Sequence, residues 1–242
     1  MSATIAVVIP AWNEPESIGS VLAEIPVELR GMVHVVVGDH DDPTAARAAA
    51  HGASVVYPKL RGYGAACLAG AQAAMASGAS ILAFLDGDYS DPPSDLTRIV
   101  GPVVDGRSDV CLGIRDYSNH PHALPRHARL GNWTVSLLMR GLIGAPYLRD
   151  LPSMKALSCD TLLGLNLQET TYGWTVELLA KSLRSELVIT QLPVSYRPRL
   201  AGHSKVSGTL RGSVGAGWKL GSCAVRYARW TPGPGAGRPQ RT

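Results

Sequence analysis

Short runs of apolar residues, each bounded by turn-forming residues, recur along the first half of the chain. The runs are residues 4–9, 33–37, 54–57, 81–85 and 110–113. Segments with helical spacing lie between them, at residues 15–23, 43–50, 64–77 and 93–104. Apolar runs of this length are typical of buried strands, and strands that alternate with helices form parallel sheets covered on both faces. The pattern predicts an α/β fold with a mostly parallel sheet flanked by helices.

The second half of the chain is less regular. A polar loop at 115–129 contains three histidines, His120, His122 and His127, which we interpret as solvated residues and not as metal ligands. Further strands are predicted at 150–157 and 187–192, with helices at 160–165 and 175–184 between them. A helix at 130–142 is expected to bury Leu130, Val135, Leu138 and Leu142.

A basic helix is predicted near the C-terminus, at 208–230. One stripe of it carries the apolar positions Leu210, Val214, Trp218, Gly221 and Val225, and another carries Arg211, Lys219 and Arg226. This pattern suits a helix that lies on a membrane or docks onto the domain. Residues 231–242 are rich in Pro, Gly and Arg and are expected to be disordered.

The composition is that of a globular protein, with 242 residues, 45% hydrophobic and 17% charged. No apolar run approaches the ~18 residues of a membrane span, and no basic segment precedes an apolar one at the N-terminus. Cys67, Cys111, Cys159 and Cys223 lie far apart. We therefore expect buried thiols, a reducing compartment and a cytoplasmic protein.

Charge is distributed unevenly along the chain. Up to Glu186 there are 14 basic and 19 acidic residues, and beyond it there are nine basic residues and no acidic one. Such a basic C-terminal part indicates phosphates, an anionic membrane surface or nucleic acid as partner. Nucleic acid is disfavoured because the chain has a single Phe and no aromatic array for stacking.

The strongest chemical signal follows the apolar run 81–85. Asp86 and Asp88 flank Gly87 directly after it, and ligands of open α/β sheets bind beyond the carboxyl ends of strands. Mg²⁺ and Mn²⁺ prefer oxygen ligands and are commonly shared between carboxylates and a substrate phosphate. The alternative interpretation is ordinary turn chemistry after a strand.

A second glycine-rich segment, Gly62-Tyr63-Gly64, is not a dinucleotide fingerprint. It follows the third predicted strand and lacks the third glycine and the later acid of that motif. Glycines before a helix, close to Lys59 and Arg61, still suit a phosphate or a ribose.

Six segments, in order, resemble family 2 glycosyltransferases. They are Val7 to Glu14, Arg61 to Gly64, Phe84 to Pro92, Asp150 to Ala156, Tyr172 to Glu177, and Tyr196 to Gly208. The resemblance is closest to the dolichol-phosphate mannosyltransferase-like, polyprenyl-phosphate branch, and it covers roughly residues 4–220. It implies a GT-A fold that combines a Rossmann-like nucleotide-binding half with an acceptor half.

The resemblance also implies roles for individual residues. Those expected at the nucleotide sugar are Pro10, Ala11, Asn13, Glu14, Asp39, Arg61, Gly62, Asp86 and Gly87. Asp86 and Asp88 would hold Mg²⁺ or Mn²⁺ against the diphosphate. Those expected at the diphosphate or acceptor are Lys155, Arg197, Arg199, Ser204 and Lys205. Cations aimed at a diphosphate stabilise the charge that develops when the sugar leaves.

Asp150 and Glu177 match family positions and are the candidates for a catalytic base. An inverting transferase needs such a base when its acceptor is a hydroxyl. A phosphate monoester is already ionised near neutral pH, because its second pKa is about 6. With a lipid phosphate as acceptor, these carboxylates would orient groups instead.

One segment departs from the family pattern. The acidic sequence after the second predicted strand is Gly38-Asp39-His40-Asp41-Asp42, one residue shorter than usual, so Asp39 is the candidate for recognition of the base.

We expect one domain over residues 1–230, with a nucleotide-sugar half (1–114), an acceptor half (115–206) and the basic helix (207–230). The expected function is metal-dependent sugar transfer, with inversion, from a UDP- or GDP-linked donor to polyprenyl phosphate at the inner face of the membrane. The alternatives are a soluble acceptor (a sugar, an aglycone or phosphoglycerate) or a silent nucleotide-binding protein of the same fold.

Overall fold

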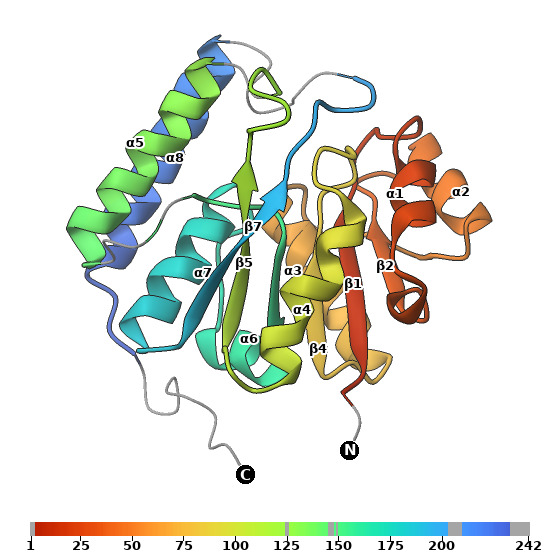
Figure 1. Ribbon diagram of the computed structural model, residues 1–242, viewed down its shortest axis with the longest axis horizontal. Coiled ribbons are helices and arrows are strands. Elements are labelled where there is room, and N and C mark those ends of the chain that lie inside the picture. Colours follow the sequence, from red (N-terminus) through yellow and green to blue (C-terminus); the bar gives the residue numbers. More distant parts are fainter. Residues whose placement is uncertain (1–2, 124–125, 145–147, 149, 203–209, 233–242) are drawn as a thin grey trace.

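A seven-stranded sheet forms the centre of the computed structural model, which describes residues 3–123, 126–144, 148, 150–202 and 210–232 (Figure 1). Its strands are β1 (Ile5–Pro10), β2 (Val33–Val36), β3 (Ser54–Val56), β4 (Ile81–Phe84), β5 (Val110–Asp116), β6 (Lys155–Ser158) and β7 (Ile189–Ser195). They lie in the order β3-β2-β1-β4-β6-β5-β7. β6 is antiparallel to β4 and β5, whereas the other pairs are parallel. The predicted mostly parallel α/β sheet is confirmed.

Helices cover both faces of the sheet. They are α1 (Ile18–Glu24), α2 (Pro43–Ala50), α3 (Tyr63–Ala76), α4 (Leu96–Val104), α5 (Arg126–Ile143), α6 (Cys159–Leu165), α7 (Gly173–Arg184) and α8 (Leu210–Ala228), with short 3-10 turns at Val27–Leu29 and Pro93–Asp95. One core contains residues of α1, α2 and α4, and the other contains residues of α3, α5, α6, α7 and α8. In β1 the side chains alternate between the two cores, with Val7 and Ile9 in one and Ala6 and Val8 in the other.

Local features of the sequence account for several of these elements. Asp42 caps α2 by accepting a hydrogen bond from the amide of Thr44, and Pro43 occupies the first helical position. All four cysteines are buried and free, as expected from their spacing.

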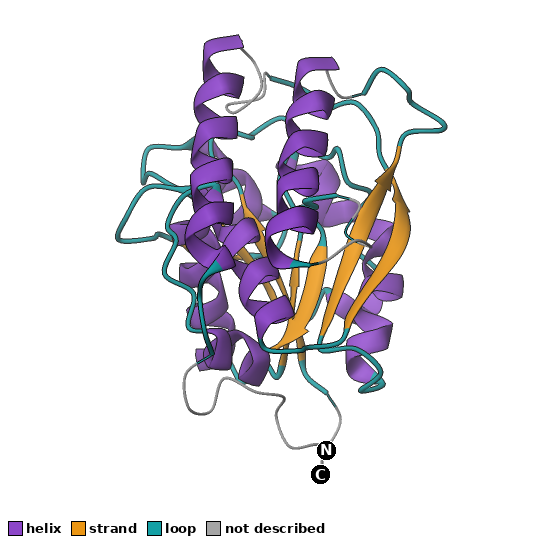
Figure 2. Ribbon diagram, turned by 90° about the vertical axis from the view of Figure 1, so that its left-hand side faces the viewer, coloured by secondary structure: helices purple, strands orange, loops and turns teal. Residues whose placement is uncertain are grey.

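The expected α5 face is partly wrong. Val135 and Met139 are buried, whereas Leu138 and Leu142 are exposed. The main partners of α5 are α8 and, to a lesser extent, α7 (Figure 2). α7 and α8 cover only part of the circumference of α5, so part of its apolar surface remains exposed to solvent.

α8 docks onto the domain, which is one of the two placements predicted for it. The helix docks onto α5 and α7 with Cys223, Ala224 and Tyr227 buried, whereas Trp218 and Val225 of the predicted apolar stripe are exposed. Basic residues on its inner edge pair with a buried acid, as described below. Within the described residues, no helix has the length and apolar content needed to cross a membrane.

Candidate active site at the carboxyl ends of the strands

The loops after β1 and β4 meet at the upper edge of the sheet in Figure 1, because these strands are parallel neighbours. A Cβ atom on Gly87 would lie only 2.7 Å from the Cβ of Ala11, so the approach of the two loops requires glycine at this position. The hydroxyl of Ser17 donates a hydrogen bond to the carbonyl of Gly87 at 2.8 Å. The loop that carries Asp86 and Asp88 is thereby held against the loop that begins at Pro10.

Asp86 is a half-buried residue, and one oxygen of its carboxylate is buried and unsatisfied. In the described part of the chain its Oδ1 atom has no hydrogen-bond partner. Burial, together with the charges of Asp88 and Asp91, raises the pKa of Asp86 to about 7. A cation at this position would relieve both the desolvation and the repulsion between the carboxylates.

Asp88 is buried, and both of its oxygens are engaged. Its Oδ1 accepts hydrogen bonds from the amide and the hydroxyl of Ser90, at 2.9 and 2.6 Å. Its Oδ2 lies 2.7 Å from Nη2 of Arg199, whose Nη1 lies 3.2 Å from Oε1 of Glu14. Arg199 therefore joins the residues predicted for the metal and for the nucleotide.

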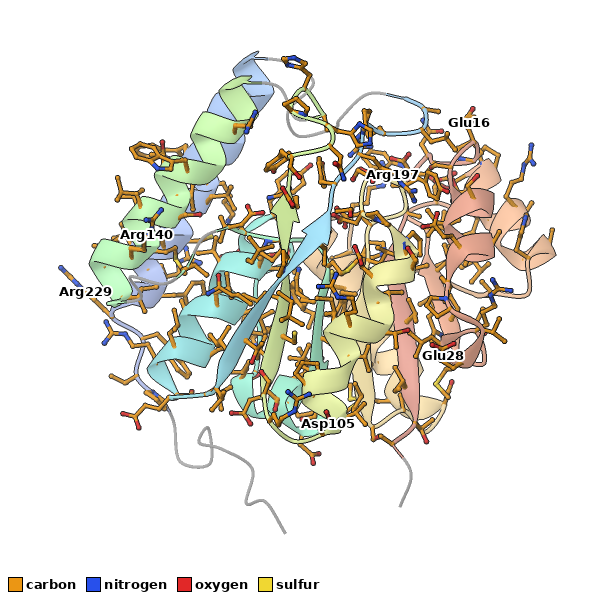
Figure 3. The ribbon with its side chains drawn as sticks, viewed as in Figure 1. Glu16, Glu28, Asp105, Arg140, Arg197 and Arg229 are labelled. Atoms are coloured by element: carbon orange, nitrogen blue, oxygen red, sulfur yellow. The ribbon has the colours of Figure 1, made fainter. Side chains whose placement is uncertain are left out.

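The segment after β7 lies over the β4 loop. The amide of Arg197 donates to the carbonyl of Ser90 at 3.0 Å, and the amide of Leu200 donates to the carbonyl of Asp88 at 3.3 Å. The guanidinium of Arg197 stacks on Tyr89 and pairs with Glu24 at 2.8 Å, and Figure 3 shows Arg197 at this edge. Arg197 therefore holds the two loops together.

The predicted nucleotide residues gather beside β1 and β2. Asp39 forms an ion pair with Arg61 at 2.7 Å, and both side chains are well exposed. The amide of Asn13, which has a φ of 54°, donates to Asp42 at 2.6 Å. The amide of Glu14 donates to the hydroxyl of Thr44 at 2.8 Å. These contacts position polar side chains along one rim of the site.

The Gly62 segment also borders this rim. The amide of Ala65 donates to the carbonyl of Thr170 at 2.9 Å, so the loop before α7 rests on the start of α3. Residues distant in sequence thus support the segment that carries Arg61 and Gly62.

Lys155 differs from its expected role. It is fully buried, its Nζ atom donates to the hydroxyl of Thr175 at 3.2 Å, and it lies over the rings of Tyr63 and Trp174. Burial lowers the pKa of Lys155, while Asp86 and Asp91 act in the opposite direction. Its charge lies beneath the carboxylates and not on a surface that a diphosphate can touch, which corrects the expected direct contact.

Asp150 is held by an arginine. Nη2 and Nε of Arg115 donate to its two oxygens at 2.6 and 2.7 Å, and both side chains are largely buried. Such a bidentate pair fixes the orientation of the carboxylate. Arg115, at the start of the polar loop 115–129, was not predicted to pair with Asp150.

Glu177 belongs to the protein interior. Its exposure is 0%, and its oxygens accept hydrogen bonds from the amides of Gln168 and Glu169 and pair with Lys181 at 2.8 Å. The carboxylate orients the loop before α7, so the structure corrects the expected role as a catalytic base.

Asp91 was not singled out as a functional residue. It is buried, one oxygen accepts from the hydroxyl of Ser153, and the other has no partner among the described residues. Burial raises the pKa of Asp91 to about 6. Its place in the Asp-Pro-Pro segment after Asp88 was the only available signal.

Two further expected residues, Ser204 and Lys205, lie outside the described residues.

A metal at this site would need ligands from a substrate. Among the described side chains, no group of three or more His, Cys, Asp and Glu residues converges on one point. Two adjacent carboxylates at a strand end nonetheless match the usual sharing of Mg²⁺ between protein and phosphate oxygens.

The model of glycosyl transferase family 2 matches residues 6–152. The chain belongs to this family. An uncharacterized glycosyltransferase of Mycobacterium tuberculosis is 37% identical over 87% of this chain and 93% of its own length. A dolichyl-phosphate hexose transferase of Haloferax volcanii is 32% identical over 84% of this chain and 86% of its own length. The family 2 transferase is therefore an enzyme, as predicted, and its relatives support the polyprenyl-phosphate branch.

Solved structures confirm the GT-A fold of this family 2 transferase. Glucosyl-3-phosphoglycerate synthase of Mycobacterium tuberculosis in complex with phosphoglyceric acid superposes with a TM-score of 0.75 and 22% identity, covering 93% of this chain and 80% of that one. A second structure of that synthase, with Mn²⁺, UDP and glucosyl-3-phosphoglycerate, gives a TM-score of 0.74 and 23% identity over the same shares. At this identity the likeness concerns the fold alone.

Proposed function

We propose that this family 2 transferase moves a sugar from a nucleotide-sugar donor to polyprenyl phosphate, with Mg²⁺ or Mn²⁺ bound by Asp86 and Asp88. The observation that carries the proposal is the unsatisfied, buried oxygen of Asp86 beside Asp88, at the loop junction where the nucleotide residues gather. A bound divalent ion would neutralise the diphosphate as it leaves.

The surrounding side chains have roles that follow from their positions. Asp39 and Arg61 form the exposed end of the site and would contact the base and ribose of the donor. When the metal binds, the guanidinium of Arg199 would leave Asp88 and pair with the diphosphate instead. Arginine suits this role because it binds phosphate with two parallel hydrogen bonds. Lys155 would limit the repulsion between the carboxylates from below.

The state of the two candidate bases favours a phosphate acceptor. Asp150 is held by Arg115, and Glu177 is buried against Lys181. Neither carboxylate is placed to take a proton from a hydroxyl, whereas a lipid phosphate needs no base because it is ionised near neutral pH. Similar proteins named for dolichyl phosphate, dolichol phosphate and undecaprenyl phosphate support the same acceptor. We place the reaction at the cytoplasmic face of a membrane.

The donor site is tested by calorimetric titration of UDP, GDP and dTDP with and without Mn²⁺. We expect one nucleotide to bind in a metal-dependent manner and Asp88→Ala to abolish that binding, with the exposed Asp41→Ala as matched control. If no nucleotide binds, the proposed donor site is refuted, and the silent nucleotide-binding alternative is refuted with it.

The acceptor is tested by transfer from the radiolabelled sugar of the nucleotide so identified. Undecaprenyl phosphate and 3-phosphoglycerate are compared at equal concentration. We expect label in the lipid fraction. Label in phosphoglycerate alone would exclude the lipid acceptor and would favour the reaction named for the structurally similar synthase.

A further inference from the structure

α5 and α8 expose large apolar side chains on one side of the molecule. The two helices lie side by side and extend beyond the strand ends (Figures 1 and 2). We name their outer surface the α5–α8 face, which contains Trp133, Leu137, Trp218 and Val225. Trp218 is 80% exposed, and Trp133 and Val225 are each 55% exposed.

α5 and α8 pack against each other. Leu138 lies at the seam, 3.8 Å from the position of a Cβ atom on Gly221. Trp133 and Leu137 are one turn apart on α5, and Trp218 and Val225 are two turns apart on α8. Since other residues of both helices already fill the core, the exposed side chains form a second apolar side that the fold leaves uncovered.

The charge of the two helices is entirely positive. Neither sequence contains Asp or Glu, whereas α5 has Arg126, Arg129 and Arg140 and α8 has Arg211, Lys219 and Arg226. Figure 3 shows Arg140 and Arg229 on the flank of the helix pair. Apolar residues with Trp, accompanied by Arg and lacking acids, are typical of helices that lie in the interface of an anionic bilayer.

The inner basic residues of α8 have a different task. Lys219 and Arg226 lie 3.4 and 3.2 Å from the carboxylate of buried Glu169. The main-chain carbonyl of Ala228 accepts a hydrogen bond from Arg184. α8 is therefore fixed to the domain by its inner edge, and its outer residues are held in a rigid orientation.

We propose that the α5–α8 face docks the protein onto the surface of an anionic lipid bilayer. This proposal adds a membrane-binding surface to the proposed function. It rests on that function only for the reason to bind a membrane, since a polyprenyl acceptor resides there. A second copy of the chain is a less suitable occupant, because two such faces would bring arginines of like charge together. The bilayer headgroups instead carry the complementary charge.

The test is sedimentation of the full chain with vesicles of phosphatidylcholine, with and without phosphatidylglycerol. We expect binding only when phosphatidylglycerol is present. Trp133→Ser combined with Trp218→Ser should weaken the partition about tenfold or more, because interfacial binding scales with buried apolar area. The matched control is Val27→Ser with Leu163→Ser, which removes exposed apolar side chains from other elements.

Charge-reversal variants test the electrostatic part of the vesicle binding. Arg229→Glu should weaken binding and reduce its dependence on salt, whereas Arg47→Glu on α2 should not. Melting temperatures establish that all variants are folded, and nucleotide titration of the same variants separates this proposal from the donor site. Unchanged vesicle binding of the double Trp variant would overturn the proposal. So would light scattering that shows a dimer which Trp218→Ser dissociates, since a second copy would then cover the face.

Discussion

Nη2 of Arg199 lies 2.7 Å from Oδ2 of Asp88, so an arginine pairs with the carboxylate that is proposed to hold a metal. The same guanidinium reaches Glu14, which belongs to the loop after β1. A divalent ion and Arg199 cannot both be the main partner of this oxygen. Metal binding and the release of Arg199 are therefore coupled events at this site.

Replacement of Arg199 should strengthen the binding of metal alone. Arg199→Gln removes the competing cation from Asp88, and we expect Mn²⁺ affinity without nucleotide to rise about tenfold, equivalent to about 1.4 kcal/mol. Binding of the Mn²⁺–nucleotide complex should weaken, because the diphosphate loses a donor. Calorimetry measures both quantities, with Arg107→Gln as a control at an exposed ion pair. Weaker binding of Mn²⁺ alone would contradict the competition.

Asp91 should make stability depend on pH. Its pKa is raised from 3.8 to about 6, so the folded chain holds the proton more tightly than the unfolded chain. The free energy of unfolding therefore falls as the pH rises between these values and stays lowered above them. The contribution of Asp91 should lower the free energy of unfolding by about 2 to 3 kcal/mol between pH 4 and pH 8, and Asp91→Asn should abolish this decrease.

Urea denaturation at the two pH values measures this difference. Asp41→Asn, at an exposed position, should leave the pH dependence as in the unaltered protein. An Asp91→Asn profile parallel to that of the unaltered protein would show that Asp91 has an ordinary pKa.

Replacement of Glu177 should reduce stability more than it alters the chemistry. Glu177→Gln leaves the buried ammonium of Lys181 without its counter-ion and should lower the free energy of unfolding by about 3 kcal/mol. Glu177→Gln with Lys181→Met should recover part of this loss, because no uncompensated charge remains. Glu186→Gln, at an exposed position, is the control. A stable Glu177→Gln variant without activity would restore the catalytic interpretation.

Asp39 should contribute to nucleotide affinity in spite of the shortened loop. Asp39→Asn removes the ion pair with Arg61 and a charged acceptor for the base or ribose, and we expect about tenfold weaker nucleotide binding. Asp41→Asn in the same loop serves as the matched control. Equal affinities of the two variants would mean that recognition of the base does not use Asp39.

The regular parts of the fold were predictable because their signals are local. The alternation of apolar runs and helical segments predicted the sheet and its helices, and Asp42-Pro43 marked the start of α2. The carboxylates at the end of β4 were also identified, since a turn after a buried strand is visible in sequence. These features depend on neighbours within a few residues.

Other features depend on contacts between distant segments. The pairing of Arg115 with Asp150, and of Glu169 with Lys219, joins residues whose separation gives no periodic signal. The buried state of Glu177 follows from Lys181 and from two amides of a preceding loop. For α8, the apolar stripe was recognised, but the sequence left open whether it faces a membrane or the domain, because helical periodicity shows that a face exists and not which partner covers it.

The antiparallel β6 lies between β4 and β5, so a strand from the later part of the chain completes the sheet of the earlier part. A fragment ending at residue 114 would expose the inner edge of β4 and the backbone beneath Asp86. Chimeras that exchange acceptor specificity between relatives would therefore have to carry β6 across with its own β4 partner. A junction between β7 and α8 would separate no paired strands, whereas a junction near residue 114 would separate β4 from β6.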